Sequence, residues 1–118
     1  MKPEMTHEEL MREIWLDKEM FRSVIKTNFA DIRTYIKDED AIHDKLLQLY
    51  DSSKTCDIDT TFKLHETLTT RLHGIAVKIG SLNRPDKDKS LTAVNNLQDA
   101  IHSVATRNLE HYCCPGKK

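Results

Sequence analysis

Apolar residues recur through the first half of the chain at the spacing of one face of an α-helix. The members of this stripe are Leu10, Ile14, Phe21, Val24, Ile25, Phe29, Ile32, Tyr35, Ile36, Ile42, His43, Leu46, Leu47 and Tyr50. Thr6 and Glu9 have the spacing of a capping box, which predicts that a helix begins near residue 7. The stripe keeps its phase across the polar segment KDED at 37–40. The pattern therefore favours one continuous helix over about residues 7–52, and a break at 37–40 is the alternative.

Two shorter helices are predicted in the second half of the chain, over about residues 58–82 and 90–112. Asp57 or Asp59 can cap the first of them, and Pro85 lies in the polar turn between the two. No segment shows the alternation of apolar and polar residues that is typical of a half-buried strand. The predicted fold is all-α: a long amphipathic helix packed on an antiparallel helical hairpin as a three-helix bundle. It becomes a four-helix bundle if the first helix breaks.

The 118 residues are enough for one compact domain over 1–118 and too few for two domains with separate cores. The formal net charge of −1 argues against a generally basic nucleic-acid binder but is compatible with a local basic patch. The polar N-terminal segment MKPEMTHEEL and the lack of a long apolar run predict a cytoplasmic protein without a membrane span. The cysteines Cys56, Cys113 and Cys114 are odd in number and two are adjacent, so free thiols are expected.

The segment RNLEHY near the C-terminus is the best candidate for a catalytic motif. Arg107-Asn108 followed by His111-Tyr112 resembles the motif of the HEPN family of small helical ribonucleases, although that family usually has four or more residues between the arginine and the histidine. The resemblance implies that His111 acts on a ribose 2′-hydroxyl and that Arg107 holds a phosphate. The competing interpretation is two residues near the negative end of a helix dipole, and we predict no catalytic residues.

Metal chemistry is a further alternative, because the chain has six histidines and many carboxylates. Di-iron bundles use paired Glu-x-x-His motifs, whereas this chain offers a single imperfect copy, Asp40-x-x-His43. The adjacent Cys113 and Cys114 are spaced too closely for a structural zinc site. His65 lies on the apolar face of its helix and is expected to be a core or interface residue. We predict no metal and no cofactor, and a small-ligand or metal-binding bundle is the alternative.

Four polar residues fall on the apolar faces of the predicted helices. Asp17, Asn28 and Glu39 do so in the first helix, and Asn108 does so in the third. A buried polar group without a partner is costly. We therefore expect these residues to pair across helices and fix their register, as a buried Asn does in a coiled coil. The alternative is a polar groove between helices.

Two segments resemble phage proteins that handle DNA. EELMREIWLD at 8–17 resembles the opening helix of the UvsY-type recombination mediators. LLQLYDSSKTCDIDTTFKLHETLTTRLHGIAVKIGSL at 46–82 is similar to the helical hairpin of the T4-type small terminases. Both families consist of small, helical, ring-forming adaptors without enzymatic activity. The resemblance implies a viral adaptor in a nucleic-acid-handling complex.

The predicted function is a non-enzymatic interaction or assembly protein that self-associates or binds a helix of a partner protein. A helix over residues 7–52 would be about 68 Å long, whereas each helix of the hairpin would span only about 36 Å. Part of the long apolar stripe would then remain exposed, which is uncommon on a monomer. The candidate interface residues are Leu10, Ile14, Asp17, Phe21, Asn28, Ile36, Glu39, His43, Leu47 and Tyr50.

Overall fold

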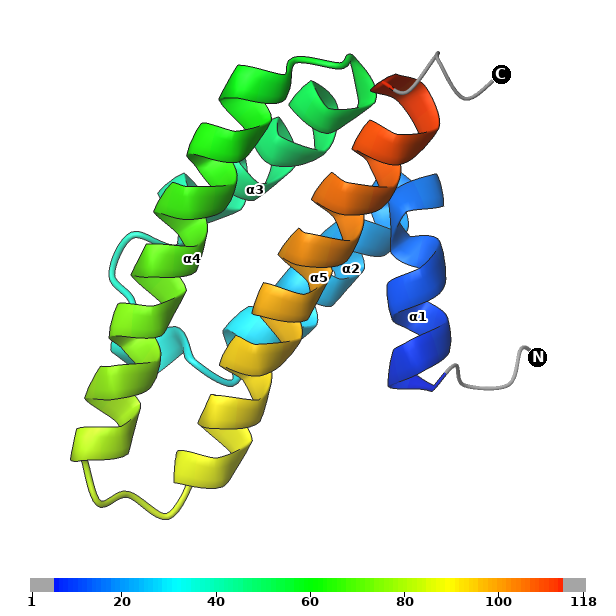
Figure 1. Cartoon of the computed structure of the whole chain (residues 1–118). Helices are drawn as coiled ribbons and strands as arrows, with labels where there is room; N and C mark the ends of the chain where they lie inside the picture. Colours follow the sequence, from blue (N-terminus) through cyan, green and yellow to red (C-terminus); the bar gives the residue numbers. More distant parts are fainter. Residues whose placement is uncertain (1–5, 114–118) are drawn as a thin grey trace.

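The computed structural model describes residues 6–113, and this part of the chain contains helices and no strand (Figure 1). The elements in chain order are α1 (His7–Glu13), the short 3-10 helix η1 (Ile14–Leu16), α2 (Lys18–Ala30), a second 3-10 helix η2 (Arg33–Tyr35), α3 (Glu39–Lys54), α4 (Ile58–Ser81) and α5 (Lys87–Cys113). The all-α prediction is confirmed. No helix within the described residues combines the length and the apolar character needed to cross a membrane.

The C-terminal hairpin follows the sequence prediction closely. The Asp57 carboxylate accepts a hydrogen bond from the Thr60 backbone N–H and so caps α4, which ends one residue before the predicted limit. After a short turn that contains Pro85, α5 begins at Lys87 and continues to Cys113. The two helices run antiparallel, and α5 also packs against α1, α2 and α3 (Figure 1). The helix α5 is therefore the central element of the bundle.

The prediction of one helix over residues 7–52 is wrong, and its first break lies at Asp17. The backbone of Asp17 is extended, and its carboxylate accepts a hydrogen bond from the Glu19 N–H at 2.9 Å, which starts α2. The Tyr50 hydroxyl donates to the carbonyl oxygen of Trp15 at 3.0 Å, and Lys18 pairs with Asp51 at 2.9 Å. These contacts from α3 hold the turned backbone in place. The chain therefore begins a new helix at Asp17 and does not continue the first one.

The second break separates α2 from α3 and is wider than the predicted break at 37–40. Each of the three neighbouring elements ties this segment down. Ser90 of α5 donates to the carbonyl oxygen of Asp31, Tyr35 donates to Asp86 in the α4–α5 turn, and Arg71 of α4 forms two hydrogen bonds with Asp38. The second prediction, a four-helix arrangement with a break in this region, is the one that the structure supports.

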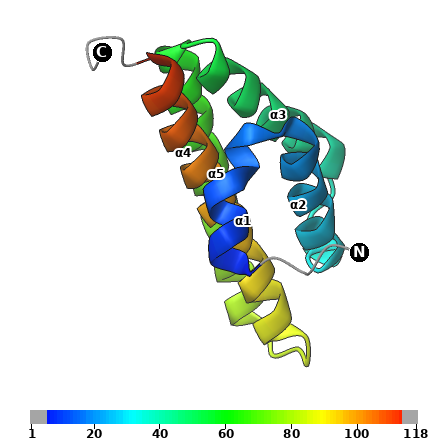
Figure 2. The same cartoon turned by 90° about the vertical axis from the view of Figure 1, so that its right-hand side faces the viewer.

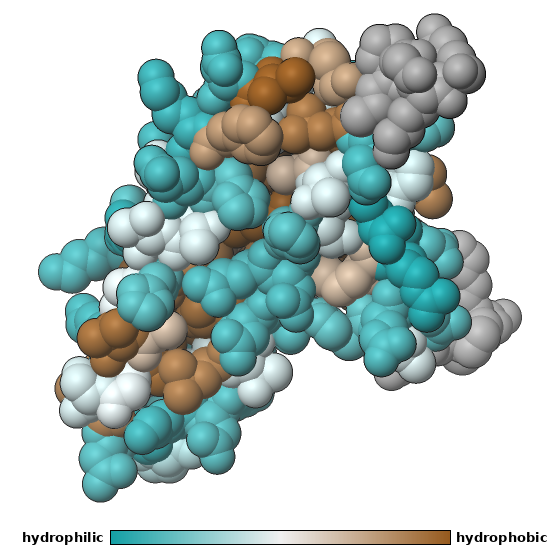
Figure 3. Space-filling view, in the orientation of Figure 1, coloured by the Kyte–Doolittle hydropathy of each residue, from teal (hydrophilic) through white to brown (hydrophobic). Residues whose placement is uncertain are grey.

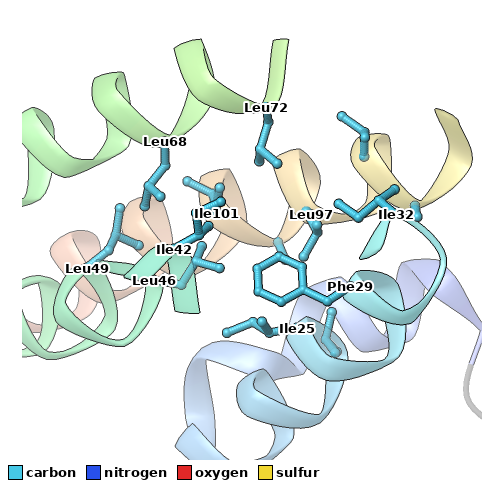
Figure 4. Close-up of a cluster of buried hydrophobic side chains, with 14 of the residues drawn as sticks. Ile25, Phe29, Ile32, Ile42, Leu46, Leu49, Leu68, Leu72, Leu97 and Ile101 are labelled. Carbon is cyan, nitrogen blue, oxygen red and sulfur yellow. The ribbon is translucent and has the colours of Figure 1, made fainter. Parts of the chain in front are cut away.

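The folded-back chain forms two layers (Figure 2). The α4–α5 hairpin makes one layer, α2 and α3 make the other, and α1 lies against α5 at the edge. Side chains from α2, α3, α4 and α5 meet in one buried cluster between the layers (Figure 4). Those labelled in Figure 4 are Ile25, Phe29, Ile32, Ile42, Leu46, Leu49, Leu68, Leu72, Leu97 and Ile101. The second layer covers one face of the hairpin and leaves its opposite face open.

Candidate functional site: the α4–α5 groove

The predicted interface residues lie mostly inside the monomer. Ile14, Phe21, Asn28, Ile36 and Tyr50 are buried within one chain. Those that are only partly buried are Leu10, Glu39, His43 and Leu47, and the exposed one is Asp17. The segment predicted as one long helix folds back twice. The hairpin of the same chain therefore covers the apolar stripe that a continuous helix would have left exposed. The structure thus removes the physical reason for placing an interface on this stripe.

The polar residues on the apolar faces serve as caps and cross-helix partners. Asp17 caps α2, as described above, and Glu39 pairs with Arg33 at 2.9 Å. Asn28 donates to the carbonyl oxygen of Val24, and its own side-chain oxygen accepts a hydrogen bond from Asn96 of α5. These contacts stabilise the bundle, and Asn28 and Asn96 also line a groove beside α1.

Asn108 of α5 is fully buried and connects α5 to the end of α3. Its amide donates to the Ser53 hydroxyl at 3.1 Å, and the Ser53 hydroxyl donates to the carbonyl oxygen of Tyr50 at 2.8 Å. Beside them, the hydroxyls of Ser52 and Thr61 lie 2.8 Å apart and join α3 to α4. A polar cluster thus fixes the end of the bundle at which α3, α4 and α5 meet.

A different surface carries two of the large apolar side chains that are exposed. Phe62 is 62% exposed and Ile58 is 42% exposed, and both lie in the first turns of α4 on the open face of the hairpin. In Figure 3, apolar residues gather where the beginning of α4 meets the end of α5. An aromatic side chain with that exposure is uncommon in a well-packed monomer, so this end of the hairpin is the best candidate for a binding surface.

A groove of about 410 Å³ lies between the two helices at this end of the hairpin. It is lined by Ile58, Phe62, His65, His102, Ala105, Thr106, Leu109, Glu110 and Cys113. We call it the α4–α5 groove. The lining is predominantly apolar, and its volume falls in the range of pockets that hold small ligands or single anchoring side chains.

The register of the hairpin explains why the groove is open at this end. The rings of His65 and His102 face each other with their centroids 6.1 Å apart. Because the helices are antiparallel, counting outward from this pair places Phe62 opposite Ala105 and Ile58 opposite Leu109. The small side chain of Ala105 leaves space beside the large ring of Phe62. A hydrophobic hollow therefore lies next to a projecting aromatic ring.

The edges of the α4–α5 groove carry more negative than positive charge. Glu110 lines the groove itself, and Asp59 and Glu66 lie on the exposed side of α4, one residue after Ile58 and one residue after His65. Lys63 is the cation on the same stretch of α4. None of these four residues has an ion-pair partner among residues 6–113. The groove is therefore an apolar surface with an acidic border.

His65 adds little positive charge to this border near neutral pH. Burial lowers the pKa of His65, and the neighbouring His102 lowers it further. His65 is therefore neutral at pH 7. Its ring contributes mainly apolar surface to the wall of the groove, and its ring nitrogens are the polar part. The sequence prediction of a core or interface histidine at position 65 agrees with this half-buried place in the groove.

A disulfide closes the end of the groove. Cys113, which lines the groove, is bonded to Cys56 in the α3–α4 turn, with 5.2 Å between the Cα atoms. The prediction of free thiols is therefore wrong for these two residues, and Cys114 lies outside the described residues.

Cys56 occupies a backbone conformation that usually requires glycine. Its φ angle is 66°, in the left-handed region, just after the end of α3. The N–H of Asp57 donates to the carbonyl oxygen of Ser52 at 2.9 Å, which is the hydrogen bond of a Schellman motif. A side chain other than glycine costs about 1 kcal/mol or more at this position. The disulfide that Cys56 forms with Cys113 offsets this conformational cost.

A second, more polar groove of about 610 Å³ lies between α1 and α5. His7 and Asp99 face each other across it at 3.1 Å. Arg12 and Arg107 line the same groove together with Glu8, Met11, His102, Ser103, Thr106 and Glu110. The carboxylates Glu8, Asp99 and Glu110 balance the two arginines, so the groove has no strong preference for an anion.

The two residues of the ribonuclease-like motif have different surroundings. Arg107 lines the α1–α5 groove, whereas the ring of His111 packs against Trp15 at 5.2 Å and against Tyr112 at 4.6 Å. Within residues 6–113, no three residues among His, Cys, Asp and Glu lie close enough to hold a metal ion. Asp40 is exposed, and the partly buried His43 packs against Phe29.

Comparison of the chain with models of protein families, with curated proteins and with solved structures gave no match. The resemblance to phage adaptors therefore remains a prediction. The interface predicted from the sequence did not include Phe62 or Leu109. The signal that could have identified Phe62 is spacing. Phe62 and His65 belong to a heptad-like seam with Ile58, Thr69 and Ala76, which lies beside the buried row of α4.

Proposed function

We propose that the protein is a non-enzymatic interaction module that binds another protein segment in the α4–α5 groove. The observation that carries this proposal is the exposed ring of Phe62 beside an apolar hollow, on a face of the hairpin that no other element within residues 6–113 covers. Aromatic side chains at such positions are typical anchors of protein interfaces. Its role would be that of an adaptor, as the resemblance to phage DNA-handling proteins also implies.

Photo-crosslinking in cells of the native host tests this proposal. A photoreactive phenylalanine analogue placed at position 62 should give a discrete protein adduct, because the side chain would lie inside the interface. Val77 provides the matched control, since it is also an apolar residue of α4 and is 58% exposed, but it does not line the groove. If position 62 gives no adduct, or the same adducts as position 77, the proposed function fails.

Cleavage of RNA is the second candidate, and the α1–α5 groove is the observation that favours it. His7 is oriented by Asp99, and Arg12 and Arg107 line the same groove. A base and two cationic groups therefore lie on one surface, although Glu8, Asp99 and Glu110 balance the charge of the arginines. Incubation of labelled RNA with the wild type and with the variants His7→Ala, Arg107→Ala and His111→Ala would decide between the two candidates. Cleavage that is lost in the first two variants would support an enzyme.

A further inference from the structure

The shape of the α4–α5 groove limits what can fill it. Its apolar part runs from Ile58 to Phe62 on α4 and from Ala105 to Cys113 on α5. Eight residues of a helix span about 12 Å, so the apolar part matches roughly two turns of a helix laid along it. A helix would present side chains to it at positions i, i+3 or i+4, and i+7. One large side chain would enter the hollow over Ala105, and its neighbours would pack against Phe62 and Leu109.

The border of the groove sets the charge of the helix that fits. Asp59, Glu66 and Glu110 have no ion-pair partners within residues 6–113, and Lys63 offsets only one of them. These carboxylates are exposed, and unpaired charges at the edge of an interface favour opposite charges on the partner and repel like charges. His65 does not cancel this preference, since burial lowers its pKa and it is neutral near pH 7.

We propose that the ligand of the α4–α5 groove is an amphipathic helix of another protein, with large apolar residues on one face and lysine or arginine along its edges. The proposal rests on the proposed function and adds the chemistry of the partner. A second copy of this chain fits less well, because a two-fold contact at Phe62 sets the acidic border of one copy against that of the other.

Synthetic peptides test this inference on the purified full-length protein. Two labelled amphipathic helices share the same leucines on the apolar face, and one has lysine and the other glutamate at the edge positions. Fluorescence anisotropy should show that the lysine peptide binds at least about tenfold more tightly at low salt, and that the difference shrinks as salt is added.

Variants of the groove distinguish the apolar contact made by Phe62 from the effect of the acidic border on peptide binding. Phe62→Ser should abolish binding of the lysine peptide, whereas Val77→Ser should leave it unchanged, and circular dichroism should show that both variants are folded. The double variant Glu66→Lys and Glu110→Lys should reverse the preference, so that the glutamate peptide binds more tightly. Such a reversal would not follow from a purely apolar contact.

Three outcomes would overturn the inference. Neither peptide binds, or both bind equally well to the wild type, or the protein forms a dimer of twice 13.7 kDa that Phe62→Ser dissociates. Each of these leaves the in-cell crosslink at position 62 as an independent result. The partner chemistry can therefore fail while the proposed interaction function stands.

Discussion

The N-terminal half of the chain and the α4–α5 hairpin both follow a helical apolar pattern, but they use it differently. The hairpin consists of unbroken helices of 24 and 27 residues. The N-terminal half is divided into α1, α2 and α3, which turn back on one another and form the second layer. The segmented half buries its stripe by changing direction, whereas the hairpin exposes part of its seam on the open face. In this protein the short helices and their turns cover the core, whereas the long helices leave part of an apolar seam exposed.

Local polar contacts decide where the segmented half turns. A row of polar positions, Asp17, Asn28 and Glu39, repeats every eleven residues along the first stripe. In the structure Asp17 caps α2, Asn28 lies near the end of α2, and Glu39 begins α3. The row therefore marks helix ends, and the same residues in an unbroken helix would have been buried without such roles.

The largest expected effect concerns the bond that joins the turn after α3 to the end of the hairpin. The Cys56–Cys113 disulfide closes a loop with a sequence separation of 57 residues. Its reduction should lower the free energy of unfolding by about 4 kcal/mol, because the unfolded chain gains conformational freedom. Urea unfolding with and without reductant measures this loss. The double variant Cys56→Ser and Cys113→Ser should respond to reductant hardly at all, and an equal response would contradict the assignment.

The next effect tests the first break in the segmented half. Asp17→Ala removes the side chain that caps α2 and should lower the free energy of unfolding by about 1 kcal/mol. Asp44 is an exposed residue within α3 and provides the control, so Asp44→Ala should change stability little. Thermal unfolding of both variants gives the comparison. Equal stability of the two variants would show that the break does not depend on its cap.

A stabilising substitution is expected at the left-handed residue after α3. Under reducing conditions Cys56→Gly should raise the free energy of unfolding by about 1 kcal/mol, because glycine adopts a positive φ without strain. Under oxidising conditions the same substitution should destabilise the protein, because it removes the disulfide. The neighbouring Thr55 has φ −94°, and Thr55→Gly should not stabilise the protein under either condition. A gain at position 55 equal to that at position 56 would argue against backbone strain.

The smallest expected effect is a pH dependence of the free energy of unfolding that arises from His65 in the hairpin. His65 has a lowered pKa in the folded protein, so the unfolded chain binds its proton more readily. Stability should therefore decrease as the pH falls below about 6.5 toward the lower folded-state pKa, and it should be insensitive to this group above that range. His65→Gln should flatten this part of the curve measured by urea unfolding. An unchanged pH profile in the variant would assign the effect to another group.

The helical pattern of the sequence was sufficient to predict the class of the fold, the hairpin and the turn at Pro85. It could not decide between an unbroken and a broken first helix, and it did not predict the break at Asp17, because apolar spacing reports which residues face inward and not whether the backbone between them is helical. The segment at 31–38 is held by Ser90, Arg71 and Asp86, which are distant in the sequence. The sequence also did not predict the α4–α5 groove. Whether Phe62 is covered depends on where the segmented half packs, and local spacing contains no such information.

The helix α1 is the least anchored part of the described chain, and this has a consequence for local unfolding. None of its residues is buried, and grooves lie on both sides of it. Its polar contacts to the rest of the protein, from Met11 to Ser103 and from His7 to Asp99, join residues 92 positions apart. With no fully buried residue and few polar contacts to the rest of the protein, α1 opens at a low free-energy cost. Backbone amides of α1 should therefore exchange with solvent through a separate, low-energy opening, while those of α4 and α5 exchange only when the whole bundle unfolds.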